Sequence, residues 1–222
     1  IIGGTPALYH GHIIATYAGG RLELGDPISG DMYWDFGNQA YGWAPPPVVS
    51  SDGIIYYLYV TADATAKLYA VDSETGQQIW EAATQFYTGF NFDAQVTVDE
   101  KNGLVYIIEG VFGDGRLFAV DRATGEVKWF LGDKQEKEGE VTFAGSIVIL
   151  DNDKLYIPAL MPRQYGKQRH LVRVDPLAQK VDLEYEVPEG MPAGWGTGWY
   201  GICSSLVYET FQDSSQREAT QL

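Results

Sequence analysis

Apolar and aromatic residues of this chain fall in short runs separated by polar segments rich in Asp, Asn, Ser and Gly. The clearest runs are rich in Val, Ile, Tyr, Leu and Phe and cover 54–60, 67–71, 104–108 and 116–120. This composition predicts β-strands, because β-branched and aromatic side chains fit a pleated surface. No long segment has apolar residues at helical spacing without Gly, Pro or β-branched interruptions. The pattern therefore predicts an all-β fold.

One phrase of eleven residues recurs along the chain. Residues 70–80 and 119–129 both read Ala-x-Asp-x-x-Thr-Gly-x-x-x-Trp, and 24–34 keeps the Asp, the Gly and the Trp. A fourth copy at 173–183 keeps only its Asp. The aspartates are spaced by 46, 49 and 54 residues, at Asp26, Asp72, Asp121 and Asp175. A repeat of about 40–50 residues predicts a stacked or circular array of similar units.

The phrase itself predicts a β-hairpin. Asp accepts hydrogen bonds from backbone N–H groups two or three residues later, and Gly supplies a positive φ without a steric penalty. The apolar run before the Asp is one strand, and the residues that lead to the Trp are the other. The Trp is suited to pack on the next unit, with its indole N–H available to a carbonyl group.

Two further strands are predicted upstream of each phrase. They are expected at 5–8 and 12–17, 47–49 and 54–60, 94–98 and 104–108, and 145–149 and 154–157. Four antiparallel strands in a unit of about 45 residues make one blade of a β-propeller. We expect one propeller domain over 1–222, with blades near 3–36, 45–82, 93–131 and 142–187 and the start of a fifth at 196–211.

The repeated phrase resembles the signature of the quinoprotein-like propeller repeat, named after the pyrroloquinoline quinone (PQQ) dehydrogenases. The resemblance covers about residues 3–187, with two full copies of the signature. It implies a propeller of four-stranded antiparallel blades that usually closes with seven or eight. Four blades that do not close would leave strand edges unpaired, so we expect at least four blades that are part of a larger ring. A compact four-bladed ring is the alternative.

Composition excludes several classes of partner. The chain has 30 acidic and 15 basic residues and a net charge of −15, so no basic stripe is available for nucleic acid. No apolar run of about 20 residues is present to span a membrane. Cys203 is the single cysteine, so no intrachain disulfide can form. An extracellular or periplasmic location is implied by the family resemblance alone.

The glycine-rich segment 191–201 lies outside the repeat and is the strongest candidate for cofactor binding. In PQQ enzymes a Trp forms the floor under the quinone, so the resemblance implies Trp195 or Trp199 for this role. Packing of the same aromatic residues, with Tyr200, against a neighbouring blade is the structural alternative. The segment around Trp43 has the same two interpretations, binding or structural packing. The prolines after Trp43 favour the structural one, because they stiffen a connection between blades.

A basic cluster stands out in this acidic chain and comprises Arg163, Lys167 and Arg169. It could dock an acidic partner or balance local charge. Trp43 and Tyr200 complete the candidate partner-binding set. No catalytic constellation and no spaced set of metal ligands is recognisable, and His10 and His12 lack an evident third ligand.

Two functions follow. The first is a non-catalytic scaffold or binding module of an exported or cell-surface protein, with a protein partner or further blades completing the propeller. The alternative is a segment of a PQQ-dependent alcohol or sugar dehydrogenase, an oxidoreductase that would need PQQ and Ca²⁺.

Overall fold

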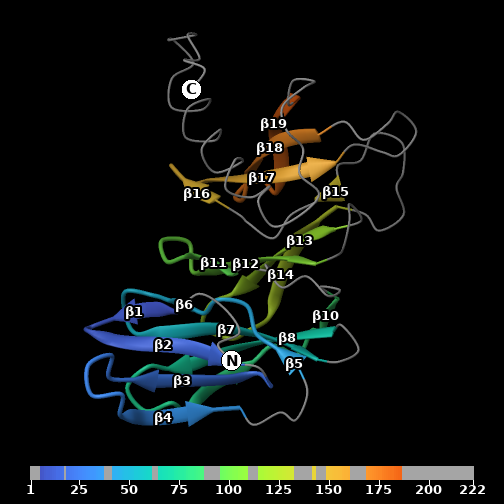
Figure 1. Ribbon diagram of the computed structural model, residues 1–222. Helices are drawn as coiled ribbons and strands as arrows, with labels where there is room; N and C mark the ends of the chain where they lie inside the picture. Colours follow the sequence, from blue (N-terminus) through green and yellow to red (C-terminus); the bar gives the residue numbers. More distant parts are fainter. Residues whose placement is uncertain are drawn as a thin grey trace.

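The computed structural model describes nine stretches of the chain: 6–17, 19–37, 42–61, 65–87, 96–109, 115–132, 142–143, 149–160 and 169–186. Within them, only the backbone is described at 42–43, 142, 149, 158–160, 169–170 and 183–186. These residues form strands and turns, with no helix among them, so the all-β prediction is confirmed. Every strand pairing is antiparallel, and the strands form separate sheets that follow one another in chain order (Figure 1).

The first sheet has the order β1-β2-β3-β4. Its strands are β1 (Ala7–Tyr9), β2 (His12–Tyr17), β3 (Arg21–Gly25) and β4 (Met32–Phe36). The third sheet repeats this order with β11 (Val96–Asp99), β12 (Leu104–Glu109), β13 (Arg116–Asp121) and β14 (Val127–Leu131). Each is a simple meander in which consecutive strands are neighbours.

The second and fourth sheets carry short additional strands. The second contains β5 (Gly42–Trp43), β6 (Val48–Val49), β7 (Ile54–Thr61), β8 (Thr65–Asp72), β9 (Gln78–Glu81) and β10 (Phe86–Tyr87). The fourth contains β15 (Thr142–Phe143), β16 (Ile149–Asp151), β17 (Lys154–Leu160), β18 (Arg169–Asp175) and β19 (Lys180–Glu186). β5 and β6 both pair with β7, as β15 and β16 both pair with β17. The first strand of each of these two sheets is therefore divided into two short strands, β5 and β6 or β15 and β16.

Each repeated phrase forms a hairpin with the same irregularity. The register shifts just before the Asp, between Leu24/Gly25, Ala70/Val71, Ala119/Val120 and Arg173/Val174. After the Asp, the predicted turn forms: the carboxylate of Asp72 accepts the backbone N–H of Glu74 at 3.0 Å and of Thr75 at 2.8 Å. Gly76 follows with a φ of 68°, a value that glycine adopts without strain.

The fourth hairpin keeps this turn although its sequence has lost Thr and Gly. The carboxylate of Asp175 accepts the N–H groups of Leu177 and Ala178, both at 3.0 Å. Gln179 takes the glycine position with a φ of 53°. The aspartate is thus sufficient to form the turn. At the glycine position, however, the fourth hairpin carries the side chain of Gln179.

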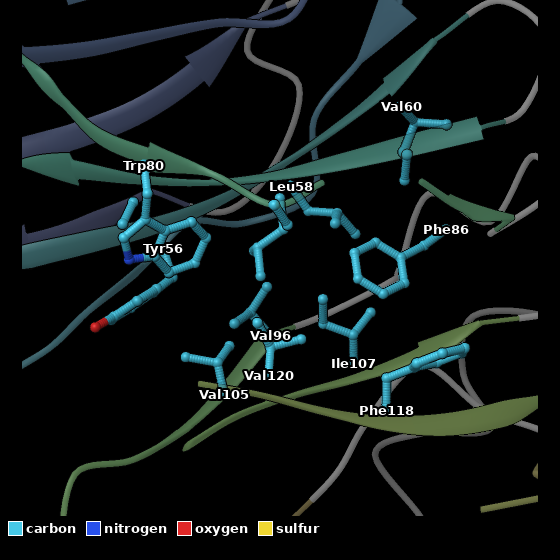
Figure 2. Close-up of a cluster of buried hydrophobic side chains, with 14 residues drawn as sticks. Tyr56, Leu58, Val60, Trp80, Phe86, Val96, Val105, Ile107, Phe118 and Val120 are labelled. Atoms are coloured by element: carbon cyan, nitrogen blue, oxygen red, sulfur yellow. The ribbon is translucent and has the colours of Figure 1, made fainter. Parts of the chain in front are cut away.

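The hydrophobic core lies between sheets rather than within one. Three clusters of buried side chains join the first sheet to the second, the second to the third, and the third to the fourth. In Figure 2, Tyr56, Leu58 and Val60 of the second sheet face Val105 and Ile107 of the third sheet. The intervening residues of β7 pack on the first sheet, which explains why this run is apolar without alternation.

The sheets are arranged as propeller blades. The first strands of neighbouring sheets contact one another, β1 with β6, β6 with β11, and β11 with β16. The first and fourth sheets lie at opposite ends of the array (Figure 1). The propeller fold expected from the repeat is confirmed.

Candidate functional site: the seams between sheets and an aromatic cleft

Two tryptophans that end a copy of the repeated phrase, Trp34 and Trp80, each join their sheet to the next. The indole N–H of Trp34 donates to the backbone carbonyl of Ser73 at 3.0 Å, and that of Trp80 donates to the carbonyl of Arg122 at 3.0 Å. Both acceptors directly follow the Asp of the next hairpin. We call each of these contacts a tryptophan seam.

The turn glycine completes each seam by letting the ring lie on the backbone. A Cβ at Gly76 would lie 2.6 Å from Cδ2 of Trp34, and a Cβ at Gly125 would lie 2.7 Å from Cε3 of Trp80. Real Cβ atoms do not approach so closely, so only glycine fits beneath the indole. The turn glycine thus serves the neighbouring sheet as well as its own hairpin.

A polar network runs beside the second tryptophan seam. The guanidinium of Arg122 contacts the carboxylate of Asp52 and the hydroxyl of Ser50, both on the turn that precedes β7. The carboxylate of Glu100, on the third sheet, accepts the backbone N–H of Ser51 at 2.6 Å. Hydrogen bonding by the Ser50 hydroxyl and then Arg122 lowers the pKa of Asp52. These side chains therefore tie the second sheet to the third.

The hairpin aspartates are held as carboxylates by their turns. The hydroxyl and N–H of Thr75 lower the pKa of Asp72, and the backbone N–H groups of Ser29 and Ile28 do so for Asp26. The Lys154 ammonium lowers the pKa of Asp175 to about 2. These carboxylates stabilise their hairpin turns by accepting backbone N–H groups.

An aromatic cleft of about 330 Å³ opens between the first and second sheets. Its walls include Phe36 from β4, Tyr57 and Tyr59 from β7 and Tyr69 from β8, and its rim carries an ion pair between Lys67 and Glu81 at 2.7 Å. The hydroxyl of Tyr57 donates to the carbonyl of Gly20, and burial raises the pKa of this phenol. The cleft offers aromatic faces and hydrogen-bonding groups.

The cleft does not fit the quinone that the sequence resemblance implies. PQQ is a polycarboxylate, and its binding needs unpaired cationic groups. The cation that lines this cleft, Lys67, is already paired with Glu81, whose carboxylate would repel an anionic ligand. We therefore derive no redox step from this cleft.

Most of the site residues expected from the sequence lie outside the described residues. This holds for the cofactor candidates Trp195 and Trp199 and for Arg163, Lys167 and Tyr200. Trp43 lies in β5 and Arg169 begins β18, but only their backbone is described. Their predicted roles remain predictions.

The described residues contain no group of three or more His, Cys, Asp or Glu side chains that could hold a metal ion. Asp99, in a turn whose composition is similar to part of a calcium loop, accepts hydrogen bonds from the Asn102 backbone, the Asn102 amide and the Tyr106 hydroxyl. The carboxylate of Asp99 thus stabilises a hairpin turn.

Of the two neighbouring histidines, His12 packs its ring edge-on against Tyr33, with ring centroids 5.0 Å apart.

Sequence reasoning missed the polar network and the aromatic cleft. Arg122 occupies a variable position of the repeated turn, and its partner Asp52 is 70 residues away, so no local pattern links them. The cleft did leave a signal: Tyr57 and Tyr59 are two residues apart on a strand and must share one face.

The four antiparallel sheets and the match to the family model identify the class of protein as a PQQ-like β-propeller, as the sequence resemblance predicted. The chain belongs to the family described as outer membrane protein assembly factor BamB, whose match covers residues 5–190. A quinohemoprotein alcohol dehydrogenase of Comamonas testosteroni is 36% identical over 108 residues, which cover 46% of this chain and 14% of that protein.

Two solved structures show the same fold. BamB from Moraxella catarrhalis has a TM-score of 0.58 at 20% identity, over 84% of this chain and 54% of that one. The quinohemoprotein alcohol dehydrogenase from Comamonas testosteroni has a TM-score of 0.61 at 17% identity, over 83% of this chain and 35% of that one. The chain therefore spans between 14% and 54% of the length of these relatives. Among the described residues we find no long apolar helix of the kind that crosses a membrane.

Proposed function

We propose that this chain is a non-catalytic propeller scaffold that binds protein partners in an exported or cell-surface protein. The observation that carries the proposal is the family match over residues 5–190, to a family described by its role in outer membrane protein assembly. Consistent with it, the described turn carboxylates Asp26, Asp72, Asp121 and Asp175 are engaged in hairpin geometry. The description of the family by outer membrane protein assembly also supports a periplasmic or extracellular location for this chain.

Partner binding is assigned to the basic cluster of Arg163, Lys167 and Arg169, with Trp43 and Tyr200 as further contacts. The chain carries a net charge of −15, so a cationic cluster on it favours an acidic partner surface.

The test is cross-linking in the exported compartment, with a photoreactive residue placed next to the cluster. Reversing the charge of all three basic residues to Glu should lower the yield of the specific adduct at least about tenfold, because close ion pairs at interfaces contribute about 1.5 kcal/mol or more. Lys180→Glu, at the exposed first residue of β19, is the control and should leave the yield unchanged. An adduct that survives the triple reversal would rule out docking through the cluster.

A segment of a PQQ-dependent alcohol or sugar dehydrogenase is the second candidate. It is favoured by the 36% identity to the quinohemoprotein alcohol dehydrogenase. In this reading Trp195 or Trp199 stacks on the quinone, and Ca²⁺ is bound with it.

Titration with PQQ and Ca²⁺ separates the two functions. A scaffold should retain no quinone absorbance after desalting and should reduce no dye when alcohols are added. Retained absorbance that is lost in Trp195→Ala or Trp199→Ala, but not in Trp80→Phe, would replace the scaffold proposal with the dehydrogenase.

A further inference from the structure

The turn between β11 and β12 contains a pair of residues that is prone to a spontaneous chemical change. Asn102 is followed by Gly103, and it is the only one of the four asparagines of the chain that precedes a glycine. The backbone nitrogen of a glycine can attack the side-chain carbonyl of the preceding asparagine, because no Cβ crowds its approach. Both residues are partly exposed, so water reaches them. The fold therefore presents a pair capable of deamidation to solvent.

The amide of Asn102 takes part in the hydrogen bonding of this turn. Its Nδ2 donates to Oδ2 of Asp99 at 2.8 Å, and its backbone N–H donates to Oδ1 of the same carboxylate at 3.0 Å. The hydroxyl of Tyr106 donates to Oδ2 of Asp99 at 3.1 Å. Asp99 is only 1% exposed, so its carboxylate relies on such donors in place of water. Loss of the Asn102 amide would remove a donor from a buried carboxylate.

The surroundings of Gly103 leave room for the reaction. Gly103 has a φ of 67°, and no described atom lies within 4 Å of the position that a Cβ would take there. Gly53 ends the corresponding turn of the second sheet, and a Cβ at that position would lie 2.9 Å from the hydroxyl oxygen of Ser73. A five-membered ring formed between residues 102 and 103 therefore meets no described neighbour on this side.

The same turn joins the second and third sheets. The carboxylate of Glu100 accepts the backbone N–H of Ser51 in the second sheet at 2.6 Å. The carbonyl of Gly103 accepts the N–H of Arg122 at 2.9 Å, and the carbonyl of Arg122 accepts the indole N–H of Trp80 at 3.0 Å. A change in the backbone at residues 102 and 103 therefore reaches the second tryptophan seam.

We propose that Asn102 is a deamidation site whose conversion loosens the joint between the second and third sheets. The backbone nitrogen of Gly103 loses its proton to solvent and bonds to the side-chain carbonyl carbon of Asn102. The bond from that carbon to Nδ2 breaks, and the amide nitrogen takes up a proton and leaves as ammonia. Water then opens the succinimide ring: addition at the side-chain carbonyl gives aspartate, and addition at the backbone carbonyl gives isoaspartate. This inference does not rest on the proposed function.

Both products oppose the geometry of the turn. Each replaces the Nδ2 donor of Asn102 with a second carboxylate near Asp99, and like charges that share a buried site repel one another. Isoaspartate also adds a methylene group to the main chain before Gly103. The added length displaces the Gly103 carbonyl from the N–H of Arg122, so the turn loses a bond to its own sheet as well as the geometry that places Glu100 beside the second sheet.

Ageing of the unsubstituted chain tests the site. After incubation at mildly alkaline pH, peptic digestion at low pH and mass spectrometry locate each asparagine that has exchanged its amide for a carboxyl group. Asn152 is the internal control, because it lies in the corresponding turn of the fourth sheet but precedes Asp153. Asn102 should convert at least about tenfold faster than Asn152, since a side chain on the following residue hinders the attack. Enzymatic methylation specific for isoaspartate should label the peptide that contains residue 102 in the aged chain but not in aged Asn102→Gln.

Hydrogen exchange in the aged chain measures the consequence. The Arg122 amide should exchange at least about tenfold faster after conversion because its acceptor is displaced, and the Ser51 amide should also exchange faster. The N–H of Ser73, which donates to the Gly53 carbonyl at 3.0 Å in the second sheet, is the matched control and should not change. Aged and fresh Asn102→Gln should not differ at these amides. The proposal is overturned if Asn102 converts no faster than Asn152, or if the Arg122 amide exchanges equally in the converted and fresh chains.

Discussion

Trp80 joins the second sheet to the third through its contact with the Arg122 carbonyl. Trp80 is 8% exposed and contributes both buried ring area and a hydrogen bond to the neighbouring sheet. Trp80→Phe keeps most of the apolar area but leaves the carbonyl without its donor, so we expect a loss of about 1–3 kcal/mol in the free energy of unfolding. Trp80→Ala should cost about 3–5 kcal/mol.

Urea unfolding followed by far-ultraviolet circular dichroism measures both variants. Ile79→Ala is the control, because this neighbouring side chain is 47% exposed and its removal should change the free energy of unfolding by no more than about 0.5 kcal/mol. If Trp80→Phe were as mild as Ile79→Ala, the indole N–H would not contribute to the seam.

Two turn glycines allow the strain of a positive φ to be separated from a steric collision with a neighbouring side chain. Gly125 and Gly103 both have positive φ, at 78° and 67°, so an alanine at either position is strained by about 1–2 kcal/mol. Only at Gly125 would the added Cβ collide with the Trp80 ring, while at Gly103 nothing lies within 4 Å. Gly125→Ala should therefore destabilise the protein by about 1–3 kcal/mol more than Gly103→Ala. Equal losses in chemical denaturation would show that backbone strain alone selects glycine.

The hairpin is the element that sequence predicted best, because its chemistry is local. Asp72 accepts N–H groups two and three residues away, and the Trp at the end of the phrase packs on the next sheet as expected. The fourth hairpin was harder to predict: its turn persists through Asp175 alone, and Gln179 adopts the positive φ. Contacts such as Arg122 with Asp52 depend on how whole blades stack, and no spacing in the sequence encodes them.

The hairpin aspartates also make the stability of the protein depend on pH. The folded-state pKa of each hairpin Asp is lowered, so its contribution to stability is complete above the unfolded value near 3.8 and is lost as pH falls through the folded value. For Asp175 the folded value is about 2, so its contribution should disappear between about pH 4 and about pH 2.

Thr75→Ala tests the cause of the shift in one hairpin. The Thr75 side chain is the largest contributor to the lowered pKa of Asp72, through a hydrogen bond of 2.8 Å from its hydroxyl. Removing the hydroxyl should raise the pKa of Asp72 toward its ordinary value, and the pKa of Asp121 in the next hairpin should stay as it is. Carboxyl carbon chemical shifts followed through an acid titration give both values. A Thr75→Ala protein with an unchanged Asp72 titration would contradict this account.

At the scale of the whole molecule, the array is held together by contacts between consecutive sheets. Its three core clusters each join one sheet to the next, and both tryptophan seams do the same. Stability in such an array is approximately a sum of the stabilities of the units and the interfaces between neighbours. A defect at one seam should therefore be felt in the two sheets that share it and weakly elsewhere.

Native-state hydrogen exchange of Trp34→Ala and Trp80→Ala tests this locality. Trp34→Ala should speed exchange in β2, β3, β7 and β8, which enclose the first seam, and should leave β17 and β18 of the fourth sheet nearly unchanged. Trp80→Ala should speed exchange in β7, β8, β12 and β13. Exchange in β2 and β3 should be faster in Trp34→Ala than in Trp80→Ala. The two variants serve as controls for each other, since each removes the same side chain from an equivalent position. Uniform acceleration across all four sheets in both variants would mean that the array opens as one cooperative unit, and the description by neighbouring seams would be wrong.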